Sequence, residues 1–280
     1  MIINTASGSV RETAPAEAEA LLKELGQPAA ISSPRPHELM EALQAAVDAK
    51  PDILVVLAGD GTARAAIELC GPKGPLVAPL PGGTMNMLPH AVYGVRPWQE
   101  ALTLALTRGV ERRLDGGEVD GHKFLVAAIL GAPALWAPAR EAARKGKPKI
   151  ALRRAQIAFR RAFKGRLRYI IETGPREKAE ALVFMCPLTS KGMDSHEQAL
   201  EAAAMDPAGA AEAFRLGVNA ILGDWRSDPA VEVARCKLAR VWASGGIPAL
   251  LDGEPVRLGS LAEVSFRPGV GRILMAPDEA

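Results

Sequence analysis

The chain has 280 residues, of which 48% are hydrophobic and 24% are charged, with a formal net charge of +2. This composition is typical of a globular protein and excludes intrinsic disorder and fibrous repeats. No apolar run approaches the roughly 20 residues that a membrane-spanning helix needs, and the first residues lack the basic and apolar regions of a secretory signal. We therefore expect a cytoplasmic protein with one large or two modest domains.

The first third of the sequence alternates short apolar runs with helical patterns, which is typical of a parallel sheet covered by helices. In chain order, the expected strands are residues 2–3, 29–31, 53–57 and 76–80. The expected helices are residues 16–25, 37–49 and 62–70, which end at a glycine or shortly before a proline.

After about residue 110 the pattern changes to alternating polar and apolar residues, which is typical of antiparallel strands. Such strands are expected at residues 117–128, 166–173, 179–185, 230–233, 238–243 and 256–258. Residues 194–217 have little β character, and no element is predicted there. We predict an α/β fold with a parallel-sheet domain over residues 1–112, to which residues 270–280 return, and a β-sandwich domain over residues 113–269.

A glycine-rich turn follows the third expected strand, where Ala58 leads into Gly59-Asp60-Gly61-Thr62 and a helix. Glycines let backbone N–H groups converge on an anion, and the helix N-terminus adds about half a positive charge. The turn therefore predicts a phosphate site. Asp60 is suited there to reach Mg²⁺ or an acceptor hydroxyl. In the alternative interpretation, Asp60 and Thr62 only cap the helix.

A second glycine turn, Pro-Gly-Gly-Thr-Met-Asn at residues 81–86, follows the next expected strand and also opens a helix. Two such turns should lie side by side at the carboxyl edge of the sheet, where ligands bind in open α/β folds. Thr84 and Asn86 offer a hydroxyl and an amide to a nucleotide, and Gly82 and Gly83 permit close approach. A tight turn capped by Thr84 is the alternative.

Four short motifs together resemble the diacylglycerol kinase catalytic-domain family, which includes bacterial lipid kinases and sphingosine kinases. Its Gly-Gly-Asp-Gly-Thr loop corresponds to residues 58–62, with Ala58 in place of the first glycine, and its Pro-x-Gly-Thr-x-Asn loop to residues 81–86. Its opening Asn-Pro-x-Ser-Gly motif corresponds to residues 4–8, and its late Asp-Gly-Glu motif to Asp252-Gly253-Glu254.

The resemblance implies a nucleotide-binding first domain like that of NAD and diacylglycerol kinases, and a second domain for a lipid substrate. It implies transfer of the γ-phosphoryl group of Mg-ATP to a lipid hydroxyl, with ATP between the domains. Glu254 is then the general base that accepts the hydroxyl proton, and Asp252 arranges this base or the magnesium. Without the family, residues 252–254 are an ordinary turn between strands.

The resemblance also implies which residues contact the nucleotide. A family threonine near the end of the second strand corresponds most nearly to Ser32, which keeps the hydroxyl. Asp60 would organise the metal or the nucleotide, and so belongs to the catalytic group as well. The implied nucleotide-binding residues are Ser32, Ala58, Gly59, Asp60, Gly61, Thr62, Gly83, Thr84 and Asn86.

One departure concerns a metal site. Bacterial relatives commonly carry an Asp-Gly-x-Leu-Asp segment that helps to hold a structural magnesium, and the nearest match is Glu-Gln-Ala-Leu-Glu at residues 197–201. The Asp-Gly pair is absent. Either the metal site is lost, or Glu197 and Glu201 rebuild it differently, and we assign no metal ligand.

A basic segment lies in the second domain. Between Arg140 and Arg168 there are twelve Lys or Arg residues and one acid, Glu141. One interpretation is peripheral contact with anionic lipid at the inner membrane face. The other is a solvated helical face. We do not expect nucleic acid as a partner, and the sequence leaves the oligomeric state open.

Two other functions stay open. NAD kinases are related and share the first glycine loop, although residues 81–86 and 252–254 resemble the lipid branch. A non-catalytic or regulatory nucleotide-binding protein is favoured by Ala58, by Thr5 in place of the proline of the opening motif, and by the missing Asp-Gly pair. In that case ATP would bind without turnover.

Overall fold

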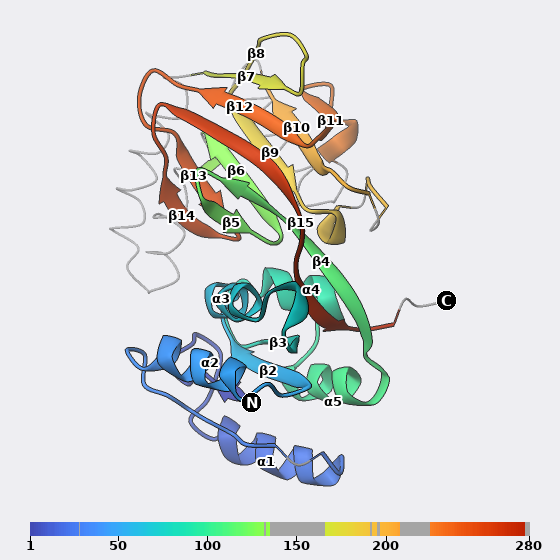
Figure 1. Ribbon diagram of the computed structural model, residues 1–280. Helices are drawn as coiled ribbons and strands as arrows, with labels where there is room; N and C mark the ends of the chain where they lie inside the picture. Colours follow the sequence, from blue (N-terminus) through green and yellow to red (C-terminus); the bar gives the residue numbers. More distant parts are fainter. Residues whose placement is uncertain are drawn as a thin grey trace. The chain divides into compact units, whose positions relative to one another are not determined.

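The computed structural model describes residues 1–27, 29–131, 133–134, 166–190, 192–194, 197–207 and 225–277. The chain divides into two compact units (Figure 1). The N-terminal unit comprises Met1–Asp115 together with the residues from Pro268 onward, and the C-terminal unit comprises Gly116–Arg267. Two long strands, β4 (Val110–Val119) and β15 (Leu261–Met275), contribute residues to both units.

The N-terminal unit contains a parallel sheet in the order β1-β2-β3-β15. Its strands are β1 (Ile2–Ile3), β2 (Ile53–Ala58) and β3 (Leu76–Pro81), and Ile273 of β15 pairs in parallel with Val77. In β2 and β3 every residue after the first is buried, because helices pack against the sheet. Continuous apolar runs are what such doubly covered strands require.

Five α-helices surround this sheet: α1 (Ala14–Glu24), α2 (Leu39–Asp48), α3 (Asp60–Cys70), α4 (Met87–Tyr93) and α5 (Trp98–Arg108). α1 buries Ala14, Ala18 and Leu22, which share one face at a spacing of four residues. α3 ends at Gly71, whose φ of 61° suits glycine, and a short 3₁₀ turn, η1 (Gly71–Lys73), follows.

The strand predicted at residues 29–31 is not formed. Only Ser32 pairs with β1, as an isolated bridge to Ile2 in which the Ile3 N–H donates to the Ser32 carbonyl at 2.9 Å. The next bond of a parallel ladder would need an N–H group at position 34, and Pro34 has none. Pairing therefore does not continue beyond Ser32. Residues 29–31 precede Ser32 and, in this register, lie outside the span of the two-residue strand β1.

The C-terminal unit is made of two antiparallel sheets. In the first, the order is β15-β12-β7-β8, with β4 on the other side of β15 and β5 beside β4. The new strands are β5 (His122–Phe124), β7 (Leu167–Ile171), β8 (Glu177–Ala179) and β12 (Leu238–Trp242). The sequence predicted one strand at residues 117–128. Asp120 and Gly121 instead form a tight turn with positive φ that joins β4 to β5.

The second sheet has the order β11-β10-β9-β6-β13-β14. Its strands are β6 (Ala127–Gly131), β9 (Ala181–Met185), β10 (Leu200–Met205), β11 (Val231–Cys236), β13 (Pro248–Leu251) and β14 (Glu254–Arg257). Two short 3₁₀ turns, η3 (Pro187–Thr189) and η4 (Trp225–Ser227), lie in the loops.

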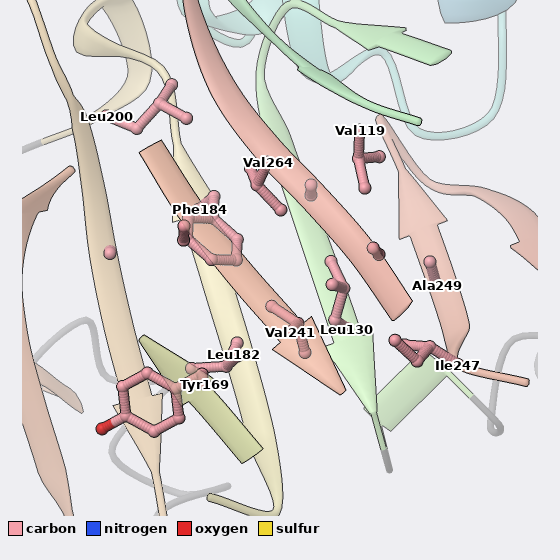
Figure 2. Close-up of a cluster of buried hydrophobic side chains, with 14 of the residues drawn as sticks. Val119, Leu130, Tyr169, Leu182, Phe184, Leu200, Val241, Ile247, Ala249 and Val264 are labelled. Carbon is pink, nitrogen blue, oxygen red and sulfur yellow. The ribbon is translucent and has the colours of Figure 1, made fainter. Parts of the chain in front are cut away.

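The two sheets enclose one hydrophobic core, which confirms the predicted β-sandwich (Figure 2). Phe184 and Leu130 enter it from one sheet, and Val241 and Val264 enter it from the other. All four side chains are fully buried. Each contributes roughly 1.5–3 kcal/mol by leaving water, and this burial holds the sheets together.

β10 was not predicted, because its sequence Leu-Glu-Ala-Ala-Ala-Met is rich in residues that are uncommon in strands. The strand lies between β9 and β11, and all its residues except Met205 are buried. Its position in the interior of the sheet outweighs its weak β propensity. β13 and β15 were also not predicted.

The contact between Gly117 and Phe124 provides a test of the sandwich packing. A Cβ atom added at Gly117 would lie 2.1 Å from Cζ of the buried Phe124 ring. We expect Gly117→Ala to lower the free energy of unfolding by about 1–3 kcal/mol, as measured by urea titration, because the core is overpacked. Gly245→Ala is the matched control, since nothing lies within 4 Å of its added Cβ. Equal stability of the two variants would contradict this packing.

Candidate functional site

Three loops meet at the carboxyl ends of the parallel strands β1, β2 and β3. They are residues 4–10, 58–62 and 81–86, and backbone hydrogen bonds join them. The Asn4 N–H donates to the Leu57 carbonyl at 2.9 Å, and the Ser9 N–H donates to the Gly82 carbonyl at 3.2 Å. The two glycine turns are therefore neighbours, and the opening motif lies beside them.

The glycines of the second turn are needed for contact between the loops. A Cβ atom at Gly83 would lie 2.7 Å from the Gly59 Cα atom, and one at Gly82 would lie 2.7 Å from the Ala58 nitrogen. At Gly59 the added Cβ would meet the Ser7 hydroxyl at 3.5 Å, which is an ordinary contact. The sequence attributed Gly82 and Gly83 to close approach of a ligand, but the approaching group is the neighbouring backbone.

Asn86 shapes the second turn from within. Its backbone adopts a left-handed conformation with φ of 49°. Its side-chain oxygen accepts the Gly83 N–H at 2.7 Å, and its amide nitrogen donates to the Gly83 carbonyl at 3.2 Å. Both ends of the amide are thus occupied inside the loop. The Asn86 amide, for which the sequence predicts a nucleotide contact, stabilises the turn.

Asp60 links the two glycine turns. Its carboxylate is buried at 9% exposure and accepts the Leu88 N–H, in the first turn of α4, at 3.0 Å. Burial raises the pKa of Asp60, while the backbone N–H groups of residues 86–88 oppose this by stabilising the charged form. Asp60 therefore does not cap α3, the helix named in the alternative interpretation, and instead accepts a hydrogen bond from the start of α4.

The N-termini of α3 and α4 consequently differ in capping. The N-cap of α3 is Gly59, and no side chain caps this end of the helix. The Thr62 and Ala63 N–H groups donate to the Gly59 carbonyl, at 3.1 Å each. Asp60 is the acidic residue in the first turn of α3, but its carboxylate accepts the Leu88 N–H of α4, so the first N–H groups of α3 have no side-chain cap.

The other predicted nucleotide contacts are spread unevenly around this edge. Thr84 is exposed and Thr62 is half-buried, whereas the Ala58 side chain is buried at 1% exposure. Ser32 is exposed and lies beside β1, in the segment that pairs with β1 rather than with β2. β1 therefore separates Ser32 from the strand that leads to the first glycine turn.

The late Asp-Gly-Glu motif lies in the C-terminal unit and forms the hairpin between β13 and β14. Asp252 and Gly253 have φ of 48° and 83°, and Leu251 pairs directly with Glu254. Such a turn with two left-handed residues suits the twist of antiparallel strands. The motif is thus a strand-to-strand turn, and Glu254 begins the edge strand with its side chain exposed.

The Asp252 carboxylate accepts hydrogen bonds from three backbone N–H groups. Its buried carboxylate accepts the Leu125 N–H at 2.8 Å through Oδ2, and the Val126 and Ala127 N–H groups at 2.9 and 3.0 Å through Oδ1. These bonds fix the segment between β5 and β6 against the turn that precedes Glu254. The sequence assigned Asp252 to the base or the magnesium. Its contacts make it a positioning residue for the turn.

The described residues contain neither a cluster of metal-binding side chains nor a membrane-spanning helix. Among them, no group of three or more His, Cys, Asp or Glu side chains is arranged to hold a metal ion. Of the helices described, none is both long and apolar enough to cross a membrane. Apart from residues 166–168, the basic segment lies outside the described residues, and Arg166 forms an ion pair with Asp206 at 2.9 Å.

The N-terminal unit is an α/β domain with three loops at the carboxyl edge of its parallel sheet, and the C-terminal unit is a β-sandwich. Residues 1–119 match the family model described as the diacylglycerol kinase catalytic domain. The match includes both glycine turns and the opening motif. No curated protein matches the sequence.

Solved structures of two kinds of kinase share this fold. A diacylglycerol kinase from Bacillus anthracis str. Sterne is similar at 18% identity with a TM-score of 0.75, covering 99% of this chain and 96% of that one. An NAD kinase from Archaeoglobus fulgidus, in complex with ATP, is similar at 11% identity with a TM-score of 0.53, covering 98% of this chain and 92% of that one. At these identities the likeness shows the fold alone, and it confirms the predicted fold class.

The capping role of Asp60 can be tested by stability. We expect Asp60→Ala to lower the free energy of unfolding by about 1–2 kcal/mol, because α4 loses the acceptor at its N-terminus. Asp60→Asn keeps an acceptor oxygen and removes a charge that burial disfavours above the ordinary pKa of 3.8, so its stability at pH 7 should match or exceed that of the native chain. If Asn destabilises as much as Ala in urea titrations, the cap is not the role of this oxygen.

The positioning role of Asp252 predicts a larger effect. Asp252→Asn keeps the size and tolerates the left-handed backbone, but turns an NH₂ group toward N–H donors. We expect a loss of roughly 2–4 kcal/mol in guanidinium titrations, since buried donors lose a charged acceptor. Glu254→Gln, two residues away and exposed, should leave stability unchanged. An equal effect of the two variants would contradict the role given to Asp252.

Proposed function

We propose that this protein is an ATP-dependent lipid kinase, which transfers the γ-phosphoryl group of Mg-ATP to a lipid hydroxyl such as that of diacylglycerol. The observation that carries the proposal is the uncapped N-terminus of α3 within three converging loops, in a domain that matches the family model of the diacylglycerol kinase catalytic domain. A helix end of this kind favours phosphate through its free N–H groups and its dipole.

The nucleotide phosphates would bind at the start of α3. Gly59 and Gly61 carry no side chain that could block the backbone N–H groups, and the Ser7 hydroxyl lies beside Gly59. Thr62 and Thr84 are accessible enough to contact the nucleotide. Ala58, the departure from the family loop, is buried, so its methyl group leaves the accessible surface of the loop unchanged.

When bound, Mg²⁺ would neutralise part of the negative charge on the nucleotide phosphates. The magnesium ion in phosphoryl-transfer sites is held largely by substrate phosphates and water, with few protein carboxylates. The site fits that pattern, because the Asp60 carboxylate is engaged by α4 and the described residues assemble no three-ligand cluster. Asp60 would act on the nucleotide by fixing the second glycine turn.

Glu254 is the proposed general base. Its carboxylate is exposed at the end of a turn that Asp252 anchors through three backbone hydrogen bonds. A carboxylate held in this way can accept a hydrogen bond from the lipid hydroxyl, orient it and take its proton as the phosphoryl group is transferred.

The test is transfer of labelled γ-phosphate from Mg-ATP to lipids in mixed micelles. We expect labelled lipid with the native chain and about 10²–10⁴-fold less with Glu254→Gln, whose unfolding temperature stays unchanged. Glu19→Gln, an exposed change on α1, is the control and should keep full activity. The panel includes diacylglycerol, a ceramide, a sphingoid base and phosphatidylglycerol.

The same assay separates the alternatives. Labelled NAD in place of labelled lipid would assign the chain to the NAD kinase activity. ATP binding without any labelled acceptor, together with no effect of Glu254→Gln, would favour a regulatory nucleotide-binding protein.

A further inference from the structure

A buried acid lies in the C-terminal unit, away from the residues assigned to catalysis. Glu201 of β10 is fully buried, and it is the last residue of the Glu-Gln-Ala-Leu-Glu segment that the sequence analysis compared with a magnesium-binding motif. An ionised carboxylate removed from water costs several kcal/mol unless a cation and hydrogen bonds compensate. The structure must therefore supply a positive charge at this position.

Arg226 of η4 supplies it. Its Nε atom lies 2.5 Å from Oε1 of Glu201, and its Nη2 atom lies 3.0 Å from Oε2. The Ser190 hydroxyl also donates to Oε2. The guanidinium lies over the Trp225 ring at 4.3 Å from its centroid. Burial alone would raise the pKa of Glu201, but the Arg226 and Ser190 hydrogen bonds hold it below its usual value.

A second arginine pairs with the other acid of this segment. Arg235 of β11 binds both carboxylate oxygens of Glu197, at 2.5 and 3.0 Å. Its Nη2 atom also donates to the Gly192 carbonyl at 2.8 Å. The Gly192 N–H donates in turn to the Ser190 hydroxyl at 3.1 Å. The two acids and two arginines thus form one network around Ser190 and Gly192.

A magnesium ion does not fit this network. Mg²⁺ demands six oxygen ligands in near-octahedral geometry at about 2.0–2.1 Å. Both oxygens of Glu201 already accept N–H or O–H donors, and those of Glu197 accept the Arg235 guanidinium. The space is also filled, because a Cβ atom added at Gly192 would meet Glu201 Oε1 at 3.2 Å and Arg226 Nε at 3.3 Å. Two guanidinium groups would repel a divalent cation.

We infer that the Arg226 guanidinium is a built-in replacement for a structural divalent cation, so that the β-sandwich of this protein folds and stays stable without bound metal. The chain balances its buried acid with a covalently attached charge. This inference concerns the C-terminal unit alone and does not depend on the proposed kinase activity.

The experiment is thermal unfolding of the full chain without nucleotide, in EDTA and in excess Mg²⁺. We expect the native chain to unfold at the same temperature in both buffers. Arg226→Met should lower that temperature by about 10 °C in both, because it leaves a buried charge unpaired. The double variant Arg226→Met/Glu201→Gln should recover part of this loss, since the unpaired charge is then removed.

Glu201→Gln is the variant that decides the metal question, because it removes the charge and keeps the size of the side chain. A Mg²⁺-dependent rise in the unfolding temperature of the native chain that disappears in Glu201→Gln would overturn the inference. So would an Arg226→Met variant as stable as the native chain. The comparison in EDTA and Mg²⁺ stays informative even if Arg226→Met fails to fold, since it uses the native chain and Glu201→Gln.

Discussion

The hydrogen bond between the Leu88 N–H and the Asp60 carboxylate is the constraint on which the arrangement of the two glycine turns depends. It connects the start of α3 to the start of α4, and thereby joins the two glycine turns. Asp60 lies in the first turn of α3, yet its carboxylate accepts a backbone N–H of α4, so no side chain caps the start of α3. One buried carboxylate thus couples the starts of two adjacent helices.

The C-terminal unit uses the same physical device for a different purpose. Asp252 satisfies three backbone N–H groups that would otherwise be buried without partners, and these bonds fix the hairpin before Glu254. In both units the aspartate of the motif organises backbone. Thr84 in one unit and Glu254 in the other are exposed. Motif residues therefore divide into those that build the site and those that face solvent.

Charge compensation also distinguishes the two units. The proposed phosphate site brings its divalent cation with the nucleotide, so the protein need not assemble a set of carboxylates around it. The sandwich instead pairs its buried Glu201 with a guanidinium that is part of the chain. Arginine suits this position because its planar group binds both carboxylate oxygens at once and cannot lose its proton.

The sequence by itself determined the elements whose signal is local. The continuous apolar runs of β2 and β3, the glycine turns after them and the alternating strands of the sandwich all follow from neighbouring residues. Local signals failed where pairing partners decide the outcome. Residues 29–31 form no strand because they precede Ser32, the residue paired with Ile2, and so lie outside the span of the two-residue strand β1. The alanine-rich β10 becomes a strand because β9 and β11 flank it.

The motifs showed which residue types gather at the site, but only the tertiary structure decided what each side chain does. Asp60 reaches a backbone group 28 positions away, and Asp252 reaches one 126 positions away. Arg226 meets Glu201 across 25 positions. Hydrogen bonds and ion pairs depend on distances of a few ångströms between atoms. Spacing along the chain does not fix those distances until the strands and helices have packed.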